Sequence, residues 1–293
     1  MTSRILVATD LSEASAEAVR QADAHARATS GAFAVSHVVP NLQSVHMLFP
    51  QLYAREAMAH PQFEELAGDA VAKSVAELTG RPEADLELFI DQGTPYAEIV
   101  RRAASWKATR LYVGGHGATG LTGVLLGSVA ERVVRHATCS VLVTRAMAPT
   151  GTVVVATDLS DPSQRAVLAA LEEARHRNAR LVAVHALDLG LPLAAIGGPF
   201  GAVPVMPPAD ALNDMRQAAR AALTEMVSRL GGKADVEVLD GAAAPAIARA
   251  VESLSAELLV IATHGRTGLA RVALGSVAER LVGSVAVPVL VVR

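Results

Sequence analysis

Cysteine, aromatic side chains and excess charge are all scarce in this sequence of 293 residues, and each shortage excludes a class of protein. The single cysteine, Cys139, cannot close an internal disulfide, which suits a reducing compartment. A formal net charge of −3 gives no basic surface for nucleic acid or an anionic membrane. No apolar run reaches the ~18 residues of a membrane span, and the first residues lack a signal-peptide layout. We therefore predict a cytoplasmic protein with no nucleic acid or membrane partner.

Metal-binding patterns are missing as well. The nine histidines form no His-x3-His pair and no HExxH motif, and there is no cysteine cluster, so the sequence predicts no zinc site. Aliphatic side chains are abundant instead: 51% of the residues are hydrophobic, whereas 3% are aromatic. A core of Val, Leu, Ile and Ala is typical of helices packed on a buried parallel sheet.

The second half of the sequence repeats the first. The run Ala-Thr-Asp-Leu-Ser occurs around Asp10 and again around Asp158, 148 residues later. The same offset relates two pairs of histidines and one pair of glycines, namely His37 and His185, His116 and His264, and Gly127 and Gly275. A repeat of this length predicts two tandem domains, at 1–147 and 148–293, joined by a linker near 146–151. The runs 84–88 and 234–238 match at an offset of 150, which indicates a compensated slip.

Strand-like and helix-like runs alternate within each half. In the first half we expect strands at 4–9, 33–39, 85–90, 110–114 and 140–144, and helices near 13–30, 62–79, 95–106 and from 128. This alternation predicts an α/β fold with a doubly wound, mostly parallel sheet of five strands. Ligands bind such sheets beyond the carboxyl ends of the strands, where the strand order reverses. The residues to consider are therefore Asp10, His37, 91–93 and the loop 114–128. The segments 40–62 and 188–212 could be lids, contact surfaces or packing over the sheet edge.

The loop after the fourth strand contains a literal GxGxxG match at 115–120, the fingerprint of dinucleotide-binding proteins. That fingerprint belongs after the first strand, and the repeat breaks it because Thr263 replaces Gly115. We reject the dinucleotide interpretation. Both halves keep a glycine-rich loop that leads into a helix at Gly127-Ser128 or Gly275-Ser276. Such loops direct backbone N–H groups at one centre, so the pattern predicts an anion-binding site.

Helix capping is the alternative role for several of these residues. Ser128 and Glu131 have the spacing of a capping box, as do Asp10 and Glu13, and the repeat keeps the first of these pairs. Capping would account for the serine and the acidic residues but not for the glycines, so both roles stay open. His37, at the end of the second strand, we interpret as a hydrogen-bonded structural residue.

The spacing Gly114-x2-Gly117-x9-Gly127-Ser128 resembles the ATP-binding signature of the universal stress protein family. A first strand that ends in Thr-Asp, a second that ends in His-Val and a closing Val-Leu-Val strand are also similar to that family. The resemblance covers nearly all of both halves. It implies two Rossmann-like domains of the adenine nucleotide alpha hydrolase-like type, related by a pseudo-twofold axis across which the strands 141–143 and 289–291 pair. The chain would then be an intramolecular pseudo-dimer, with a further homodimer left open.

The function that this resemblance implies is an ATP-binding regulator of the stress response that acts on a protein partner, with magnesium beside the phosphates. It is not expected to be an enzyme beyond slow ATP hydrolysis, since the loop has no Walker A lysine and no nucleophile paired with a base. The alternative is a stress scaffold that binds no nucleotide.

The family's nucleotide contacts can be carried over residue by residue. The resemblance places adenine and ribose near Ala8, Asp10 and the backbone of Val38, and the phosphates at the glycine loop and the following helix. The residues so assigned are, in the first half, Ala8, Asp10, Val38, Gly114, Gly115, His116, Gly117, Gly120, Gly127, Ser128 and Val129, and in the second half, Ala156, Asp158, Ala186, Ala262, His264, Gly265, Arg266, Gly268, Gly275, Ser276 and Val277.

The second signature departs from the family pattern because Ala262 replaces its first glycine. Alanine is tolerated there if φ is negative, whereas a positive φ would distort the loop. A methyl group could also crowd the nucleotide. Arg266, which stands where the first half has Ala118, could face phosphate or lie on the surface. We expect the first site to bind ATP and the second to be weaker.

Overall fold

The computed structural model describes residues 3–40, 50–115, 126–145, 150–188, 197–198, 201–202, 208–263 and 274–293. The chain divides into two compact units, Met1–Ala146 (unit 1) and Met147–Arg293 (unit 2). Among the described residues, no helix combines the length and the apolar character that a membrane crossing requires.

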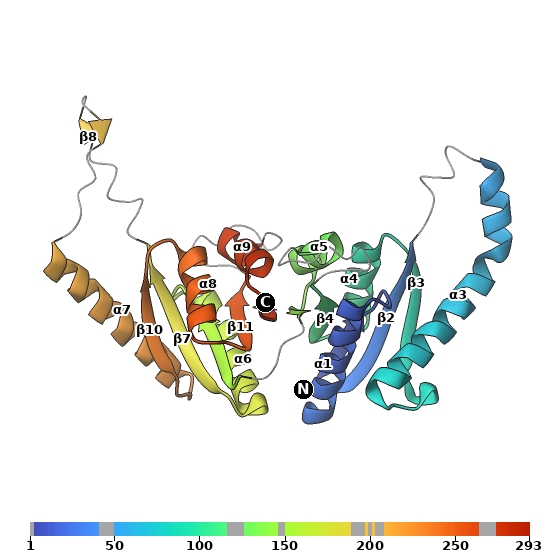
Figure 1. The fold of residues 1–293 in the computed structure, drawn as a ribbon, viewed down its shortest axis with the longest axis horizontal. Coiled ribbons are helices and arrows are strands. Elements are labelled where there is room, and N and C mark those ends of the chain that lie inside the picture. The colour runs from blue at the N-terminus through green and yellow to red at the C-terminus, as the bar shows by residue number, and fades with distance from the viewer. Residues whose placement is uncertain are drawn as a thin grey trace. The chain divides into compact units, whose positions relative to one another are not determined.

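Unit 1 alternates strands and helices in chain order (Figure 1). The elements are β1 (Arg4–Ala8), α1 (Glu13–Thr29), β2 (Ala32–Pro40), α3 (Pro50–Thr79), a 3-10 turn (Glu83–Asp85), β3 (Glu87–Gly93), α4 (Pro95–Ser105), β4 (Arg110–Gly114), α5 (Ser128–His136) and β5 (Ser140–Thr144). The strands pair in parallel in the order β5-β4-β1-β2-β3. Helix α1 packs against α3, and α4 packs against α5.

Unit 2 repeats this arrangement. Its elements are β6 (Thr152–Ala156), α6 (Asp161–Arg177), β7 (Arg180–Leu187), the short strands β8 (Gly197–Gly198) and β9 (Gly201–Ala202), α7 (Ala209–Arg229), β10 (Asp235–Asp240), α8 (Ala243–Ser253), β11 (Leu258–Ala262), α9 (Ser276–Ser284) and β12 (Val289–Val292). The order of the parallel strands is β10-β7-β6-β11-β12, and β8 pairs with β9 in antiparallel fashion. The predicted α/β class with a mostly parallel sheet in each half is confirmed.

Strand pairing corrects the offset that we inferred around the third strand. Ala34 of β2 pairs with Glu87 of β3, and Val182 of β7 pairs with Asp235 of β10. Both partners therefore stand 148 residues from their counterparts, and the compensated slip is wrong. A shift of two residues keeps every side chain on the same face of a strand. The sequence pattern could not exclude that shift, but the hydrogen-bonded register does.

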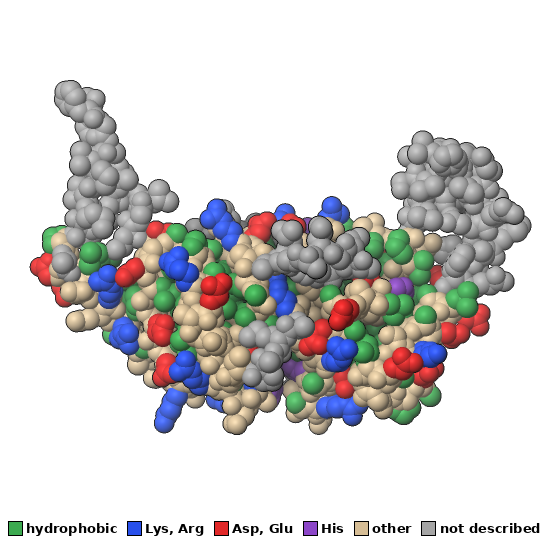
Figure 2. Space-filling model, viewed as in Figure 1, with side chains coloured by type: hydrophobic (Ala, Val, Ile, Leu, Met, Phe, Trp, Pro, Cys, Tyr) green, Lys and Arg blue, Asp and Glu red, His purple; other side chains and the backbone are tan. Residues whose placement is uncertain are grey.

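Aliphatic side chains fill the core of each unit, as the composition predicts. Ile5, Leu6 and Val7 of β1 have no exposed surface, and neither do 153–155 of β6. Strands buried on both faces read as continuous apolar runs, which explains why these segments show no polar alternation. On the face drawn in Figure 2, basic and acidic side chains lie interspersed. Helix α3 differs from the prediction because it begins at Pro50 rather than near residue 62.

Candidate functional site

The strand order reverses beside β1, which places the predicted ligand edge at the carboxyl ends of β1, β2 and β4. Val7 pairs with Tyr112 of β4, and Ala8 pairs with Ser36 of β2. The amide of Thr9 continues this ladder and donates to the carbonyl of Ser36 at 3.0 Å. The carboxyl ends of β1, β2 and β4 therefore lie side by side. The same pairing recurs in unit 2, where β6 lies between β7 and β11.

The turn between β1 and α1 holds the carboxylate of Asp10. Its Oδ1 accepts hydrogen bonds from the backbone amide of Ser12 at 3.1 Å and from the hydroxyl of Ser12 at 2.5 Å. Ser12 is the N-cap of α1, and its hydroxyl oxygen accepts from the amide of Ser15. The capping box that we considered for Asp10 and Glu13 is therefore wrong, because Ser12 and not Asp10 is the N-cap. Asp10 lies two residues before the cap, exposed at the edge of the sheet.

Unit 2 builds the same turn from Asp158 and Ser160. The carboxylate of Asp158 accepts from the amide of Ser160 at 3.1 Å and from its hydroxyl at 2.5 Å. Ser160 is the N-cap position of α6, so Asp158 does not cap this helix either. The two copies of the turn thus agree in their hydrogen bonds, although their helices continue with different sequences.

Buried hydroxyls and a strained residue shape this turn. Thr9 Oγ1 is hydrogen-bonded to Ser15 Oγ at 3.0 Å and accepts from the amide of Leu11 at 3.1 Å. Leu11 has a φ of 63°, and its counterpart Leu159 has a φ of 65°. Left-handed conformations are uncommon for residues other than glycine and occur preferentially at functional sites. Their presence in both units marks the turn as a candidate site.

Two histidines, His37 of β2 and His185 of β7, hydrogen-bond to the backbone where the turn begins. His37 Nδ1 lies 2.9 Å from the carbonyl oxygen of Thr9, and His185 Nδ1 lies 2.8 Å from that of Thr157. Because a carbonyl oxygen only accepts, Nδ1 is the protonated donor in both rings. The hydrogen bond that we expected for His37 is confirmed, and His185 makes the same one.

Gly114 is a glycine because the start of α1 comes very close to it. A Cβ at this position would lie 2.9 Å from the carbonyl carbon and oxygen of Ala14. Its counterpart Ala262 does not have a positive φ. It is the last residue of β11 and pairs with Val292 of β12. The sequence left open whether φ at Ala262 is negative. It is, so the backbone there tolerates alanine, and the two positions differ only in the space that a side chain would have.

The next residues join the end of β4 to the start of α5. The amide of Gly127 donates to the carbonyl of Gly115 at 2.8 Å, and in unit 2 Gly275 donates to Thr263 at 2.8 Å. A Cβ on Gly115 would lie 3.6 Å from Cγ of Arg145, which follows β5. Burial lowers the pKa of Arg145 to about 10, so this side chain is cationic at neutral pH. The sequence analysis did not single out this arginine, although both halves end in a Val-Leu-Val strand followed shortly by Arg.

Gly127, and not Ser128, is the N-cap of α5. The first helical hydrogen bond runs from the amide of Glu131 to the carbonyl of Gly127 at 2.9 Å, and Gly275 caps α9 in the same way. The capping box that we considered for Ser128 and Ser276 is therefore wrong, because both serines are the first residues inside their helices. The backbone N–H groups of 128–130 have no acceptor within the helix. They point out of its N-terminal end, where the helix dipole places a positive partial charge. Ser128 and Val129 are exposed there.

The structure thus brings together many of the residues that the sequence analysis assigned to a nucleotide. The carboxyl edge of unit 1 carries Ala8, Asp10, Val38, Gly114, Gly115, Gly127, Ser128 and Val129, and that of unit 2 carries Ala156, Asp158, Ala186, Ala262, Gly275, Ser276 and Val277. The remaining assigned residues lie outside the described part of the chain: His116, Gly117, Gly120, His264, Gly265, Arg266 and Gly268.

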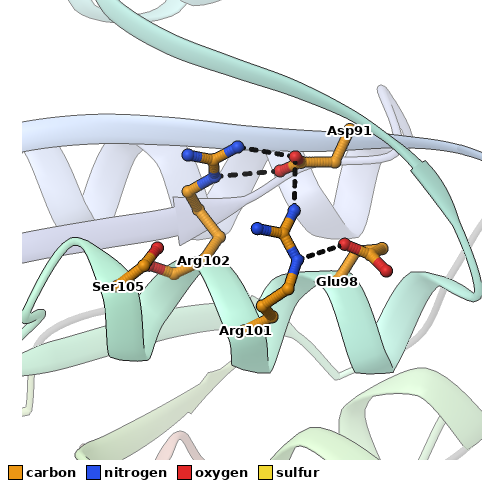
Figure 3. Close-up of polar contacts among 5 residues, drawn as sticks. All are labelled: Asp91, Glu98, Arg101, Arg102 and Ser105. Carbon is orange, nitrogen blue, oxygen red and sulfur yellow. Dashed lines mark hydrogen bonds and ion pairs between the residues drawn. The ribbon is translucent and has the colours of Figure 1, made fainter.

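Asp91, near the end of β3, lies on this edge but is neutralised by two arginines (Figure 3). Arg102 binds it in a bidentate way at 2.6 and 3.0 Å, and Arg101 donates to it at 2.7 Å. Burial acts to raise the pKa of Asp91, but the hydrogen bonds and charges of Arg102 and Arg101 outweigh burial and lower it. A carboxylate held in this way is a structural anion and not a general base. Its counterpart in the register of unit 2 is Leu239.

Comparison with known proteins points to one family. The sequence model described as the universal stress protein family matches the chain twice, at residues 1–145 and 149–293. A universal stress protein of Mycobacterium tuberculosis is 30% identical over 273 residues, which cover 86% of this chain and 87% of that protein. One from Methanocaldococcus jannaschii is 33% identical over 145 residues, covering 48% of this chain and 81% of that protein. The crystal structure of a universal stress protein from Archaeoglobus fulgidus has a TM-score of 0.64 and 21% identity, covering 99% of this chain and 98% of that one.

Proposed function

The chain belongs to the universal stress protein family, and from this premise we propose that unit 1 binds ATP at the carboxyl edge of its sheet and serves as a stress-response regulator. One observation carries the proposal. The exposed carboxylate of Asp10 and the amides at the start of α5, which have no acceptor within that helix, both lie at the carboxyl edge beside the switch point, where open α/β sheets bind their ligands.

Each group has a role that its chemistry suits. The Asp10 carboxylate accepts hydrogen bonds from the ribose hydroxyls, and the turn holds it in place through Ser12. The helix N-terminus at Ser128 and Val129 attracts the terminal phosphates, because its N–H groups and dipole favour negative charge. Val38, which is buried at the end of β2, offers its backbone to the adenine edge.

A magnesium ion would be bound mainly by the nucleotide. Among the described residues, no three His, Cys, Asp or Glu side chains are grouped so that they could hold a metal. Mg²⁺ in nucleotide sites keeps several waters and takes its other oxygens from phosphates and one or two protein groups, a demand that the Ser128 hydroxyl fits. The ion would supply charge neutralisation for the phosphates.

We propose a binding function with slow hydrolysis at most. Asp91 is held by its arginines, and His37 uses Nδ1 to hold the carbonyl of Thr9. Neither is paired with a nucleophile within the described residues, so neither offers general-base catalysis of water attack. ATP occupancy would then act by changing the surface that unit 1 presents to a protein partner.

Unit 2 is proposed as a second, weaker site. It keeps the Asp158 turn and the Gly275 cap, so the carboxylate and the amides are present. However, Ala262 and Thr263 replace two glycines and add side-chain volume beside the strand end. We therefore expect the two units to differ in affinity rather than in mode of binding.

Calorimetric titration of nucleotide-free protein with Mg²⁺ and ATP tests this assignment. Asp10→Asn keeps an oxygen acceptor for Ser12 but removes the charge, and it should weaken the tighter site on the order of tenfold. Asp158→Asn should change only the weaker site, and Asp69→Asn, on the exposed side of α3, should change neither. Wild-type protein that binds no ATP would instead favour the nucleotide-free scaffold, and equal isotherms for Asp10→Asn and wild type would contradict the assignment of the site.

A further inference from the structure

A cleft lies in unit 2, at the opposite edge of the sheet from the candidate nucleotide site. It has a volume of about 830 Å³ and is formed by the end of α6, the start of β7 and the turn between α7 and β10. Its floor is apolar, since Leu171, Ala174 and Leu181 line it and are all buried. Clefts of this size commonly hold small organic molecules.

Three cations surround this floor: Arg175, Arg180 and Lys233. Arg180 makes a 3.7 Å ion pair with Asp235, whose side chain also lines the cleft, but these side chains are 54% and 69% exposed. Such an exposed pair contributes little to stability, so a ligand can replace it at small cost. Within the described part of the chain, Arg175 and Lys233 have no carboxylate partner. The rim is therefore positively charged and accessible.

At the same place in unit 1, the basic side chains are paired with a carboxylate. Arg27, the counterpart of Arg175, is paired at 2.8 Å with Asp23, and Arg81 binds the same carboxylate and stacks on the ring of Phe33. Unit 2 has Leu171 where unit 1 has Asp23, so the arginine loses its internal anion. It also has Arg180 in place of Ala32 and Lys233 in place of Asp85. Each difference makes the cleft of unit 2 more positive.

Two glycines form the turn beside this cleft. Gly231 adopts a φ of 74°, and a Cβ at Gly232 would overlap the Cδ2 atom of Leu171. The backbone of Gly232 therefore packs directly on Leu171, whereas the positive φ of Gly231 favours glycine there. In unit 1 the corresponding residues are Glu83 and Ala84, which form a 3-10 turn. The glycine pair occurs in unit 2 alone, as do Arg180 and Lys233, whereas Arg175 has the counterpart Arg27.

We propose that this cleft binds a small organic phosphate, with its apolar or aromatic body on the Leu171–Leu181 floor and its phosphate between Arg175, Arg180 and Lys233. Guanidinium groups bind phosphate oxygens through paired N–H donors, and an ammonium adds a mobile point charge. The apolar floor explains why the ligand should carry a hydrophobic body in addition to its charge. This site is independent of ATP binding at the carboxyl edge.

Phenyl phosphate is a suitable probe, with inorganic phosphate and phenol as its two halves. Calorimetry or ligand-observed NMR on the full chain should show binding of phenyl phosphate that is at least about tenfold tighter than that of either half. Arg175→Gln and Lys233→Gln should each weaken it on the order of tenfold, since each removes a charged hydrogen-bond donor. Lys73→Gln, an exposed change of the same charge on α3, is the matched control.

The variants alter exposed side chains, and thermal denaturation should confirm that they fold as the wild type does. Phenyl phosphate that binds equally well to the Arg175→Gln/Lys233→Gln double variant would overturn the site. Phenol that binds as tightly as phenyl phosphate would overturn the role of the cations, and inorganic phosphate that binds as tightly would overturn that of the floor. Loss of binding in the Lys73→Gln control would show that net charge alone is responsible, and would also overturn the proposal.

Discussion

The two units agree in the turn between the first strand and the first helix but differ in several of their buried ion pairs. Both hold an aspartate through a serine two residues later, and both place a histidine under the turn. Only unit 1 neutralises Asp91 with two arginines and Arg27 with Asp23. The hydrogen bonds that shape this turn are thus kept in both units. The ion pairs are not: unit 2 has Leu239 and Leu171 in place of Asp91 and Asp23, and it pairs Glu173 with Arg177 instead.

Removing the carboxylate of Asp91 should produce the largest loss of stability. Asp91→Leu copies unit 2 at this position but leaves Arg102 without its anion, so we expect a loss of about 3 kcal/mol in the free energy of unfolding. The double variant Asp91→Leu/Arg102→Ala copies both residues of unit 2, Leu239 and Ala250, and should recover most of that loss. Trp106, the single tryptophan, lies in unit 1 and reports on this unit in urea denaturation. A double variant as unstable as the single one would contradict the comparison.

Acid should act on the same cluster. The folded-state pKa of Asp91 is lowered from its ordinary value of 3.8. Its stabilisation is therefore fully present above that value and is lost as the pH falls through the lower folded-state pKa. Urea titrations of unit 1 between pH 5 and the acid limit, at about half-unit steps, should show a steeper loss for wild type than for the Asp91→Leu/Arg102→Ala variant. Parallel curves would show that other carboxylates dominate.

A methyl group at Gly114 should be the next largest effect. Gly114→Ala gives unit 1 the residue of unit 2, but the methyl would meet the backbone of Ala14 at 2.9 Å. Displacing helix α1 should cost about 2 kcal/mol. The reverse change, Ala262→Gly, meets no such obstacle and should cost less than about 1 kcal/mol, through chain entropy. Equal costs in urea denaturation would show that the close approach of α1 does not explain this glycine.

Removing a buried hydroxyl from the turn should cause the smallest loss of stability, and the loss should be similar in the two units. Ser15→Ala removes the partner of Thr9, and Ser163→Ala removes that of Thr157. Each change should cost about 1 kcal/mol, because a buried hydroxyl loses a hydrogen bond. Thermal denaturation followed by circular dichroism can measure both. A large difference between the two variants would show that the turns are less alike than their hydrogen bonds.

Sequence reasoning located the edge of the site but not its capping residues. The repeated Ala-Thr-Asp-Leu-Ser identified the turn, yet Asp10, Ser12 and Glu13 are all compatible with the start of a helix. The choice of Ser12 as the cap depends on the left-handed Leu11, which turns the chain after β1. Ser128 is a similar case: its spacing to Glu131 fits a capping box, but the N-cap is Gly127, whose amide donates to the carbonyl of Gly115. The spacing of residues in a sequence does not locate the N-cap of a helix to within one or two residues.

Arg102 illustrates a different limit. It lies on α4, whose apolar period the sequence shows clearly, but its partner Asp91 comes from β3, eleven residues earlier. The pairing follows from the packing of that helix on the sheet. The cleft of unit 2 is a similar case, because its three cations come from α6, β7 and the turn before β10.

The sequence by itself determined the duplication, the order of the main strands and helices, the apolar core and the edge at which we place the candidate site. These properties depend on periodicity and on repeated motifs, which are local in the chain. Only the tertiary structure shows that the backbone of α1 leaves no room for a side chain at Gly114, that Asp91 is neutralised, and that cations line a cleft in unit 2. Those outcomes depend on the distance between segments far apart in the chain, and a distance of a few tenths of an ångström decides whether a methyl group or a charge is tolerated there.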